Sequence, residues 1–224
     1  MKIISIVEFG SSARSDADEY SDKDYFIYAD VWVDRKEIEK LTFSIMPKLK
    51  ELNPDFIIHD KTSFEFMLDR GSLFLWHLKL ESKPIYGEQE FDAMLKNLKE
   101  FKRYSQKFEN YMAVFHDMNI ARKALPKITN FDFAILFTVI RNLSILCCFK
   151  LGKPKFGRIS AFETLKSIAP DINLSKSDYK TLMNYKLEYE RGFKLTNSKE
   201  LEIEPWINKV DIFSKQVKYI LELA

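Results

Sequence analysis

The hydrophobic pattern of this 224-residue chain changes once, near residue 88, and that change constrains the fold more than any other feature. Before it, short apolar runs rich in β-branched and aromatic residues alternate with stretches whose apolar residues recur every three or four positions. After it, only the helical spacing remains. We therefore expect an α+β chain: a mixed β-sheet with flanking helices at residues 1–88, followed by an all-α helical bundle at residues 89–224.

The same periodicities place the individual elements. Strands are expected at 3–9, 24–33, 55–59 and 83–87, and helices at 35–52 and 63–82. A short helix and a loop are expected between the first two strands. In the second part, one long helix is expected over 91–124, ended by Pro126, and four more helices near 130–151, 159–168, 176–191 and 204–223.

Composition excludes several classes of protein. A formal charge of +2 gives no general affinity for polyanions, and 46% hydrophobic residues are typical of a soluble globular protein. The only cysteines, Cys147 and Cys148, are neighbours in an apolar run, which fits neither a disulfide framework nor a metal site and indicates a cytoplasmic protein. The run 131–151 is long enough to span a membrane, but Arg141 and Asn142 lie at its centre, so a buried bundle helix is expected and no membrane association.

The stretch FGSSARSDADEYSDKDYFIY, residues 9–28, carries the clearest chemical signal. Asp22 and Asp24 are two residues apart at the start of an expected strand, so their side chains should project to one side. Carboxylates that close repel one another unless water or a cation screens them. A solvated loop tip would explain the pair, and so would a divalent-metal site; Mg²⁺ is commonly held by one or two carboxylates plus substrate phosphates.

Upstream of that pair, the residues suit an anion. Gly10 allows the backbone to approach a ligand closely, and Ser11 and Ser12 offer hydroxyl and amide groups at an expected helix start. Arg14, one turn further, would add a positive charge facing a triphosphate. A surface arginine explains the same residue.

With its spacing, this stretch resembles the motif of the nucleotidyltransferase superfamily: Gly-Ser, ten residues, then Asp-x-Asp, as at Gly10, Ser11, Asp22 and Asp24. It is most similar to the minimal and antibiotic nucleotidyltransferases, written GSxAR followed by SDxD. The resemblance covers about residues 3–88. It implies a nucleoside triphosphate as donor, ATP by preference, and Mg²⁺ as the metal ion.

The resemblance also implies a third carboxylate on a later strand, for which Asp55 is the first choice and Asp60 the rival. Five residues apart on a regular strand, the two would face opposite sides, so only one could join the pair. In this family Asp22, Asp24 and Asp55 would hold the metal ion. Asp55 would also take the proton of the attacking hydroxyl.

For the helical part, the resemblance implies either a surface that lines the acceptor site or a link to toxin–antitoxin systems, in which a helical HEPN-type protein is the nucleotidyltransferase's partner. Arg141 and Asn142 resemble the start of the HEPN motif, but Ile145, Leu146 and Cys147 stand where its histidine would be. We therefore do not expect a ribonuclease.

Three polar groups keep two interpretations each. Arg141 would form a core ion pair or face a phosphate. A cluster on 185–191 would contact an acceptor or form ordinary bundle surface, and basic residues on the expected long helix would bind a nucleic-acid end or be a solvated face. The cluster on 185–191 comprises Tyr185, Glu188, Tyr189 and Arg191, and the basic residues are Lys99, Lys102, Arg103 and Lys107. His59, His77 and His116 have no ligand spacing, so zinc chemistry is not expected.

The sequence thus predicts an Mg²⁺-dependent transfer of a nucleoside monophosphate, AMP from ATP, to a hydroxyl of a small molecule, a protein or an RNA end. The rival hypothesis is an antitoxin-like or regulatory module that acts by binding a partner protein. A protein partner or a homodimer fits either hypothesis.

Overall fold

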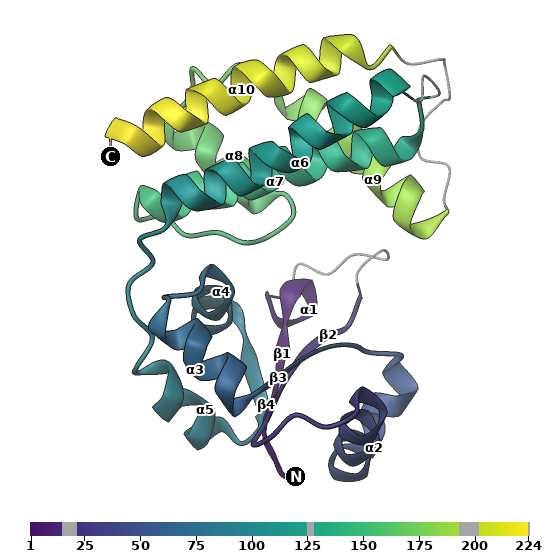
Figure 1. Cartoon of the computed structure of the whole chain (residues 1–224), viewed down its shortest axis with the longest axis vertical. Helices are drawn as coiled ribbons and strands as arrows, with labels where there is room; N and C mark the ends of the chain where they lie inside the picture. The colour runs from purple at the N-terminus through teal and green to yellow at the C-terminus, as the bar shows by residue number, and fades with distance from the viewer. Residues whose placement is uncertain (15–21, 125–127, 193–201, 224) are drawn as a thin grey trace. The chain divides into compact units, whose positions relative to one another are not determined.

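The computed structural model of the chain describes residues 1–14, 22–124, 128–192 and 202–223. Its contacts divide the chain into two compact units, Met1–Lys102 and Arg103–Ala224 (Figure 1). The first unit holds a mixed sheet with helices and the second is helical, which confirms the expected α+β class. Functional domains bounded at 1–88 and 89–224 stay a prediction.

The first unit follows the expected order of strands and helices. Its four-stranded sheet has the order β3-β2-β1-β4, in which only β2 and β3 are parallel. Its elements are β1 (Ile3–Phe9), α1 (Gly10–Arg14), β2 (Asp24–Ala29), α2 (Arg35–Ile45), the 3₁₀-helix η1 (Pro47–Leu52), β3 (Asp55–Asp60), α3 (Lys61–Asp69), α4 (Leu73–Glu81), β4 (Lys83–Tyr86) and α5 (Glu88–Leu95).

Helices cover both faces of this sheet, which explains why β1 and β2 are apolar almost throughout. Phe26 and Tyr28 of β2 pack on the face that α3, α4 and α5 cover. Tyr25 and Ile27 alternate with them and pack on the other face, under α2 (Figure 1). Asp24 continues the first of these alternations, so it lies on the α3–α4–α5 face at the start of β2.

Two expected helices are shorter in the structure because the chain contains breakers. The helix expected over 35–52 ends at Ile45, since Pro47 has no amide hydrogen to continue it, and η1 follows. The helix expected over 63–82 is two helices separated at Gly71, which has φ +60°. A Cβ at Gly71 would overlap the carbonyl oxygen of Glu100, so both backbone conformation and space require glycine there.

The prediction of one helix over 91–124 was wrong. The structure has α5, then a non-helical segment, then α6 (Tyr104–Ala124). In that segment the backbone bonds to other elements: the amide of Lys99 donates to the carbonyl of Leu68 at 3.1 Å, and Trp76 Nε1 donates to the carbonyl of Lys99 at 3.1 Å. These tertiary hydrogen bonds replace the helical ones, although the apolar spacing continues through the segment.

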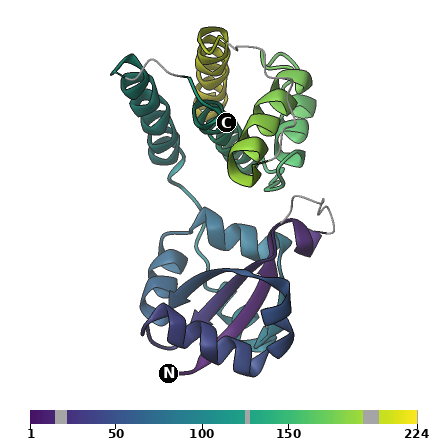
Figure 2. The ribbon, with the colours of Figure 1, turned by 90° about the vertical axis from the view of Figure 1, so that its right-hand side faces the viewer.

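The second unit is a helical bundle, as expected (Figure 2). Besides α6 it contains α7 (Asn130–Lys150), α8 (Ser160–Ile168), α9 (Lys176–Arg191) and α10 (Glu204–Leu223). α7 contacts the other four helices and supplies the centre of the core.

α7 is also the one helix in the described ranges that is long and apolar enough to cross a membrane. However, 67% of its apolar window is buried inside the bundle, which is consistent with a soluble protein. Cys147 and Cys148 lie buried on this helix as free thiols, and burial raises the pKa of each to about 12.

Candidate functional site

The end of β1 and the start of β2 meet at one edge of the sheet. The strands are antiparallel with Phe9 opposite Asp24, so Gly10, which follows Phe9, lies beside Asp24. Gly10 has φ +76°, and a Cβ built on it would lie 2.5 Å from Oδ2 of Asp24. The left-handed backbone therefore favours glycine here, and a larger residue would also displace the Asp24 carboxylate.

The register of β3 separates the two rivals for the third carboxylate. β2 and β3 are parallel, with Asp24 opposite Asp55 and Ala29 opposite Asp60. Register partners on neighbouring strands lie about 4.8 Å apart and point to the same face. Asp55 thus starts its strand next to Asp24, whereas Asp60 ends the strand roughly 16 Å away, at the opposite edge of the sheet.

Asp60 has a structural task at that opposite edge, as the N-cap of α3. Its Oδ1 accepts hydrogen bonds from the hydroxyl of Ser63 at 2.6 Å and from the amide of Ser63 at 2.9 Å. The hydrogen bond to the Ser63 hydroxyl is the main reason that the pKa of Asp60 lies below its ordinary value, and the bond to the Ser63 amide contributes in the same direction. His59, next to it, has its pKa lowered by burial.

Asp22 is exposed and precedes β2 by two residues. Residues 15–21, which include Ser21 of the motif, lie outside the described part of the chain. Asp22, Asp24 and Asp55 come from one edge of the sheet, but within the described ranges no group of three or more Asp, Glu, His or Cys side chains converges closely enough to hold a metal ion.

The donor chemistry of this edge nevertheless fits a hard divalent cation. Asp22, Asp24 and Asp55 offer carboxylate oxygens, and Mg²⁺ typically uses one or two carboxylates together with substrate phosphates rather than a complete protein cage. Gly10, which has no Cβ, leaves room beside it for the Asp24 carboxylate. When bound, the ion would neutralise phosphate charge and orient the phosphates.

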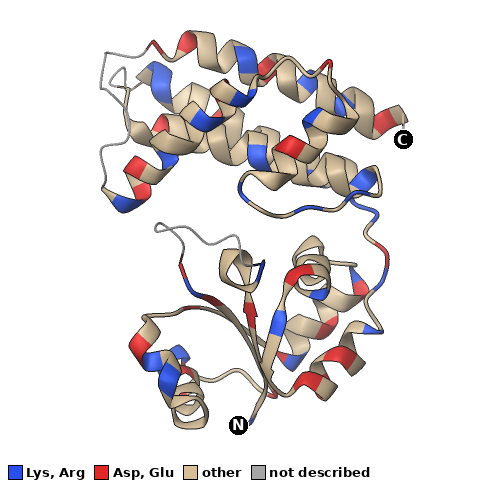
Figure 3. Cartoon of the chain, turned by 180° about the vertical axis from the view of Figure 1, so that it is seen from behind, with Lys and Arg blue, Asp and Glu red and all other residues tan. Residues whose placement is uncertain are grey.

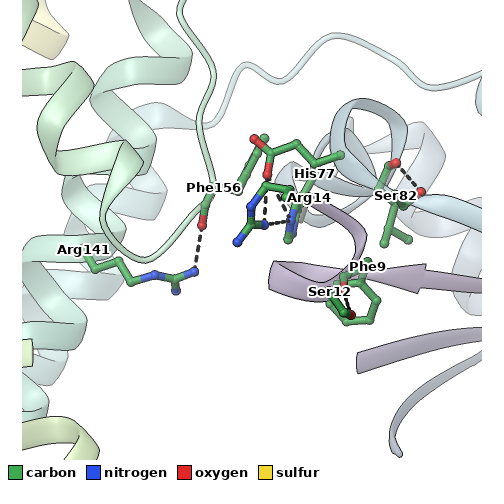
Figure 4. Close-up of polar contacts among 9 residues, drawn as sticks. Phe9, Ser12, Arg14, His77, Ser82, Arg141 and Phe156 are labelled. Carbon is green, nitrogen blue, oxygen red and sulfur yellow. Dashed lines mark hydrogen bonds and ion pairs between the residues drawn. The ribbon is translucent and has the colours of Figure 1, made fainter. Parts of the chain in front are cut away.

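The serines and the arginine of the opening stretch lie on α1, directly after Gly10. Ser11 is half-buried, and the hydroxyl of Ser12 donates to the carbonyl of Phe9 at 3.4 Å. Arg14, at the end of α1, donates from Nη1 to Oε2 of Glu81 on α4 at 3.1 Å (Figure 4). The Arg14 side chain is 16% exposed, so it is not a fully solvated surface arginine.

Sequence reasoning missed the residues of α4 that contact Arg14. Nε2 of His77 lies 3.5 Å from Arg14 Nη1 and 3.6 Å from Glu81 Oε2. The His77 ring also meets Phe9 edge-on, with ring centroids 5.8 Å apart. The one sequence signal was the four-residue spacing of His77 and Glu81, which places both on one helix face.

The basic residues near the long helix had two interpretations, a site for a nucleic-acid end or a solvated face, and their contacts favour the second. Of the four candidates, Lys107 lies on α6. Lys99, Lys102 and Arg103 precede α6 rather than lying on it. Lys99 pairs with Asp69, and Lys102 lies 3.4 Å from Glu100. Figure 3 shows acidic and basic residues interspersed along the helices of both units, which is typical of solvated faces.

The polar cluster on α9 belongs to the bundle. Tyr185 is buried and stacks on Phe133 with ring centroids 4.6 Å apart. Oε2 of Glu188 accepts a hydrogen bond from Nδ2 of Asn130 at 3.0 Å. These contacts join α9 to α7 and support the structural interpretation.

Arg141 of α7 also has a structural contact, although of a different kind from the expected ion pair. Its Nη2 donates to the backbone carbonyl of Phe156 at 2.9 Å (Figure 4). Burial raises the pKa values of Tyr111 and Tyr179, and the positive charge of Arg141 partly offsets that rise.

Comparison with known proteins agrees with this geometry. Residues 1–80 match the family model described as nucleotidyltransferase domain, a range that contains Gly10, Asp22, Asp24 and Asp55. No curated protein matches the chain. The family match and the four-stranded mixed sheet that brings Gly10 to Asp24 together show that the N-terminal part of this chain is a nucleotidyltransferase domain.

Proposed function

We propose that this chain is an Mg²⁺-dependent nucleotidyltransferase that moves AMP from ATP to a hydroxyl group. The observation that carries the proposal is the position of Gly10 beside the Asp24 carboxylate, with Asp55 next to Asp24 in the register of the neighbouring strand. A glycine turn for phosphates and carboxylates for a cation thus lie at one edge of the sheet, within a nucleotidyltransferase domain.

The residues have distinct roles in this proposal. Asp22, Asp24 and Asp55 hold the Mg²⁺ ion, while the backbone at Gly10 and Ser11, the Ser12 region and the Arg14 guanidinium contact the triphosphate. The acceptor oxygen forms a bond to the α-phosphorus, and the bond from that phosphorus to the bridging oxygen of the β-phosphate breaks. Pyrophosphate leaves, and the hydroxyl proton passes to the Asp55 carboxylate.

The acceptor is the hydroxyl of a small molecule, a protein or an RNA end. The proposal assigns nucleotide chemistry to a nucleotidyltransferase domain at residues 1–88, followed by a helical bundle domain at 89–224, in the cytoplasm. A homodimer or a protein partner is compatible with this assignment.

The test is incubation with each α-labelled nucleoside triphosphate and Mg²⁺, with and without lysate, followed by separation of protein, RNA and small molecules. We expect label from ATP in one fraction. With Asp24→Asn, transfer should fall by a factor on the order of 10³, because several kcal/mol of transition-state stabilisation depends on the ion. Asp60→Asn is the matched control: it lies on the same sheet but at the opposite edge, and its transfer rate should be unchanged.

Two results would contradict the proposal. Full activity of Asp24→Asn would remove the assigned metal site. Absence of label in every fraction, together with a stoichiometric protein partner on isolation from cells, would instead favour the antitoxin-like or regulatory module.

A further inference from the structure

The contact of Arg14 with α4 suggests a role for two residues that the motif does not contain. Arg14 Nη1 lies 3.1 Å from Glu81 Oε2 and 3.5 Å from His77 Nε2. The three side chains are only 16%, 12% and 14% exposed for Arg14, Glu81 and His77. This is a largely buried cluster, so its geometry is more fixed than that of a solvated ion pair.

The place of Arg14 on α1 connects the cluster to the phosphate turn. Arg14 follows Ser11 by three residues, a spacing that puts helical residues on one face. Helical side chains also lean towards the N-terminus of their helix, which here is the Gly10 end. Arg14 therefore belongs to the same short helix whose first residue, Gly10, borders the Asp24 carboxylate.

The neighbours of the cluster tie α4 to the same place. The His77 ring packs edge-on against Phe9, the residue that precedes Gly10 and pairs with Asp24. Ser82, which follows Glu81, donates from its hydroxyl to the carbonyl of Leu78 at 2.5 Å and so closes the last turn of α4 (Figure 4). Glu81 therefore lies on a helix end that is fixed relative to β1.

An arginine side chain has several rotatable bonds, and part of its rotamer freedom is lost when a ligand orders it. A carboxylate that already holds one edge of the guanidinium removes part of that loss before the ligand arrives. The five donors of the guanidinium let it keep this contact while another edge meets a phosphate.

From these contacts we propose that Glu81, assisted by His77, is a positioning residue that holds the Arg14 guanidinium in the orientation that receives the phosphates of a nucleoside triphosphate. The inference rests on the proposed function. A carboxylate that merely competed with phosphate for Arg14 would weaken nucleotide binding, whereas a positioning carboxylate strengthens it. The two roles therefore predict opposite changes in nucleotide affinity when the carboxylate is removed.

The experiment measures binding of a non-hydrolysable α,β-methylene analogue of ATP with Mg²⁺ to the full chain, by calorimetric titration. Glu81→Gln keeps the shape of the side chain and removes its charge. We expect its dissociation constant to rise about tenfold, equivalent to about 1.4 kcal/mol. KM for ATP should rise similarly while kcat changes little, since the contact acts on binding.

A double-mutant cycle separates positioning from general stabilisation. If Glu81 acts through Arg14, the variant with both Arg14→Gln and Glu81→Gln should bind no more weakly than Arg14→Gln alone. Glu65→Gln is the matched control. Glu65 pairs with Lys61 on α3 in the same unit and is 59% exposed, so this change should leave nucleotide binding unaltered. His77→Gln provides a second variant, which should weaken binding in the same direction.

Unchanged or tighter binding by both Glu81→Gln and His77→Gln would overturn the inference, as would additive losses in the cycle. Failure of the proposed function gives a different result: the wild-type chain itself would then transfer no label from any nucleoside triphosphate. Thermal unfolding of each variant identifies a loss that comes from unfolding rather than from Arg14.

Discussion

The carboxylate of Asp24 occupies the space that a side chain on Gly10 would need. A Cβ at Gly10 would lie 2.5 Å from Asp24 Oδ2, closer than real Cβ contacts allow. The two residues are fourteen positions apart in the sequence but adjacent across the antiparallel pair of β1 and β2. This steric relationship links the glycine of the motif to its carboxylate more directly than sequence spacing does.

Gly10→Ala should therefore destabilise the first unit and abolish nucleotide binding. The positive φ alone costs a residue with a side chain about 1–2 kcal/mol, and the clash with Asp24 adds to it. In an Asp24→Ala background the clash is removed, so the same substitution should cost only the backbone term. Urea denaturation of the four chains measures the difference.

Gly152→Ala is the control for that cycle. Gly152 also has a positive φ, +68°, but a Cβ there would have no atom within 4 Å. Its substitution should show the backbone cost alone and leave nucleotide binding intact. Equal losses for Gly10→Ala with and without the Asp24 carboxylate would contradict the steric explanation.

Asp55 and Asp60 should respond to substitution in opposite ways. Asp55 begins β3 beside Asp24, so Asp55→Asn should remove most transfer activity and change stability little. Asp60 caps α3, so Asp60→Ala should lower the free energy of unfolding by about 1 kcal/mol and leave transfer intact. Activity assays and denaturation of both variants test this pairing; loss of transfer in Asp60→Ala alone would reverse the assignment.

The stabilisation that Asp60 provides should depend on pH. Its hydrogen bonds to Ser63 lower the pKa of Asp60 in the folded chain relative to the unfolded value of about 3.9. The stabilisation is therefore present above that value and is lost as pH falls through the folded pKa. The difference in melting temperature between wild type and Asp60→Asn should shrink between pH 6 and pH 3; a constant difference would show that ionisation of Asp60 has no part in it.

The sequence was most informative where local chemistry decides structure. Apolar runs bounded by Gly10 and Pro54 predicted β1 and β3, and the spacing of Gly10 and Asp24 predicted that a turn and a carboxylate belong together. It failed at 96–103, where hydrogen bonds from Lys99 and Trp76 replace helical ones. Helical spacing cannot distinguish such a segment from a helix, because the same apolar residues can be buried in either conformation.

The Arg14 cluster could not be predicted for a related reason. Arg14 and Glu81 are 67 residues apart, and their contact depends on how α4 packs beside the end of β1. A charged residue on an expected helix has many exposed alternatives, so only the tertiary structure identifies its partner. Motif residues are recognisable from sequence, whereas the residues that position them are much less so.

The contact that Arg141 makes favours a structural role over phosphate binding. Its Nη2 donates to the carbonyl of Phe156, a buried residue of the segment between α7 and α8. Arg141→Ala would leave this carbonyl without that donor, and we expect the free energy of unfolding to fall by about 1–3 kcal/mol. Lys153→Ala, an exposed cation of the same segment, should have almost no effect. Both variants should bind ATP as the wild type does; weaker ATP binding by Arg141→Ala at unchanged stability would instead assign Arg141 to a phosphate.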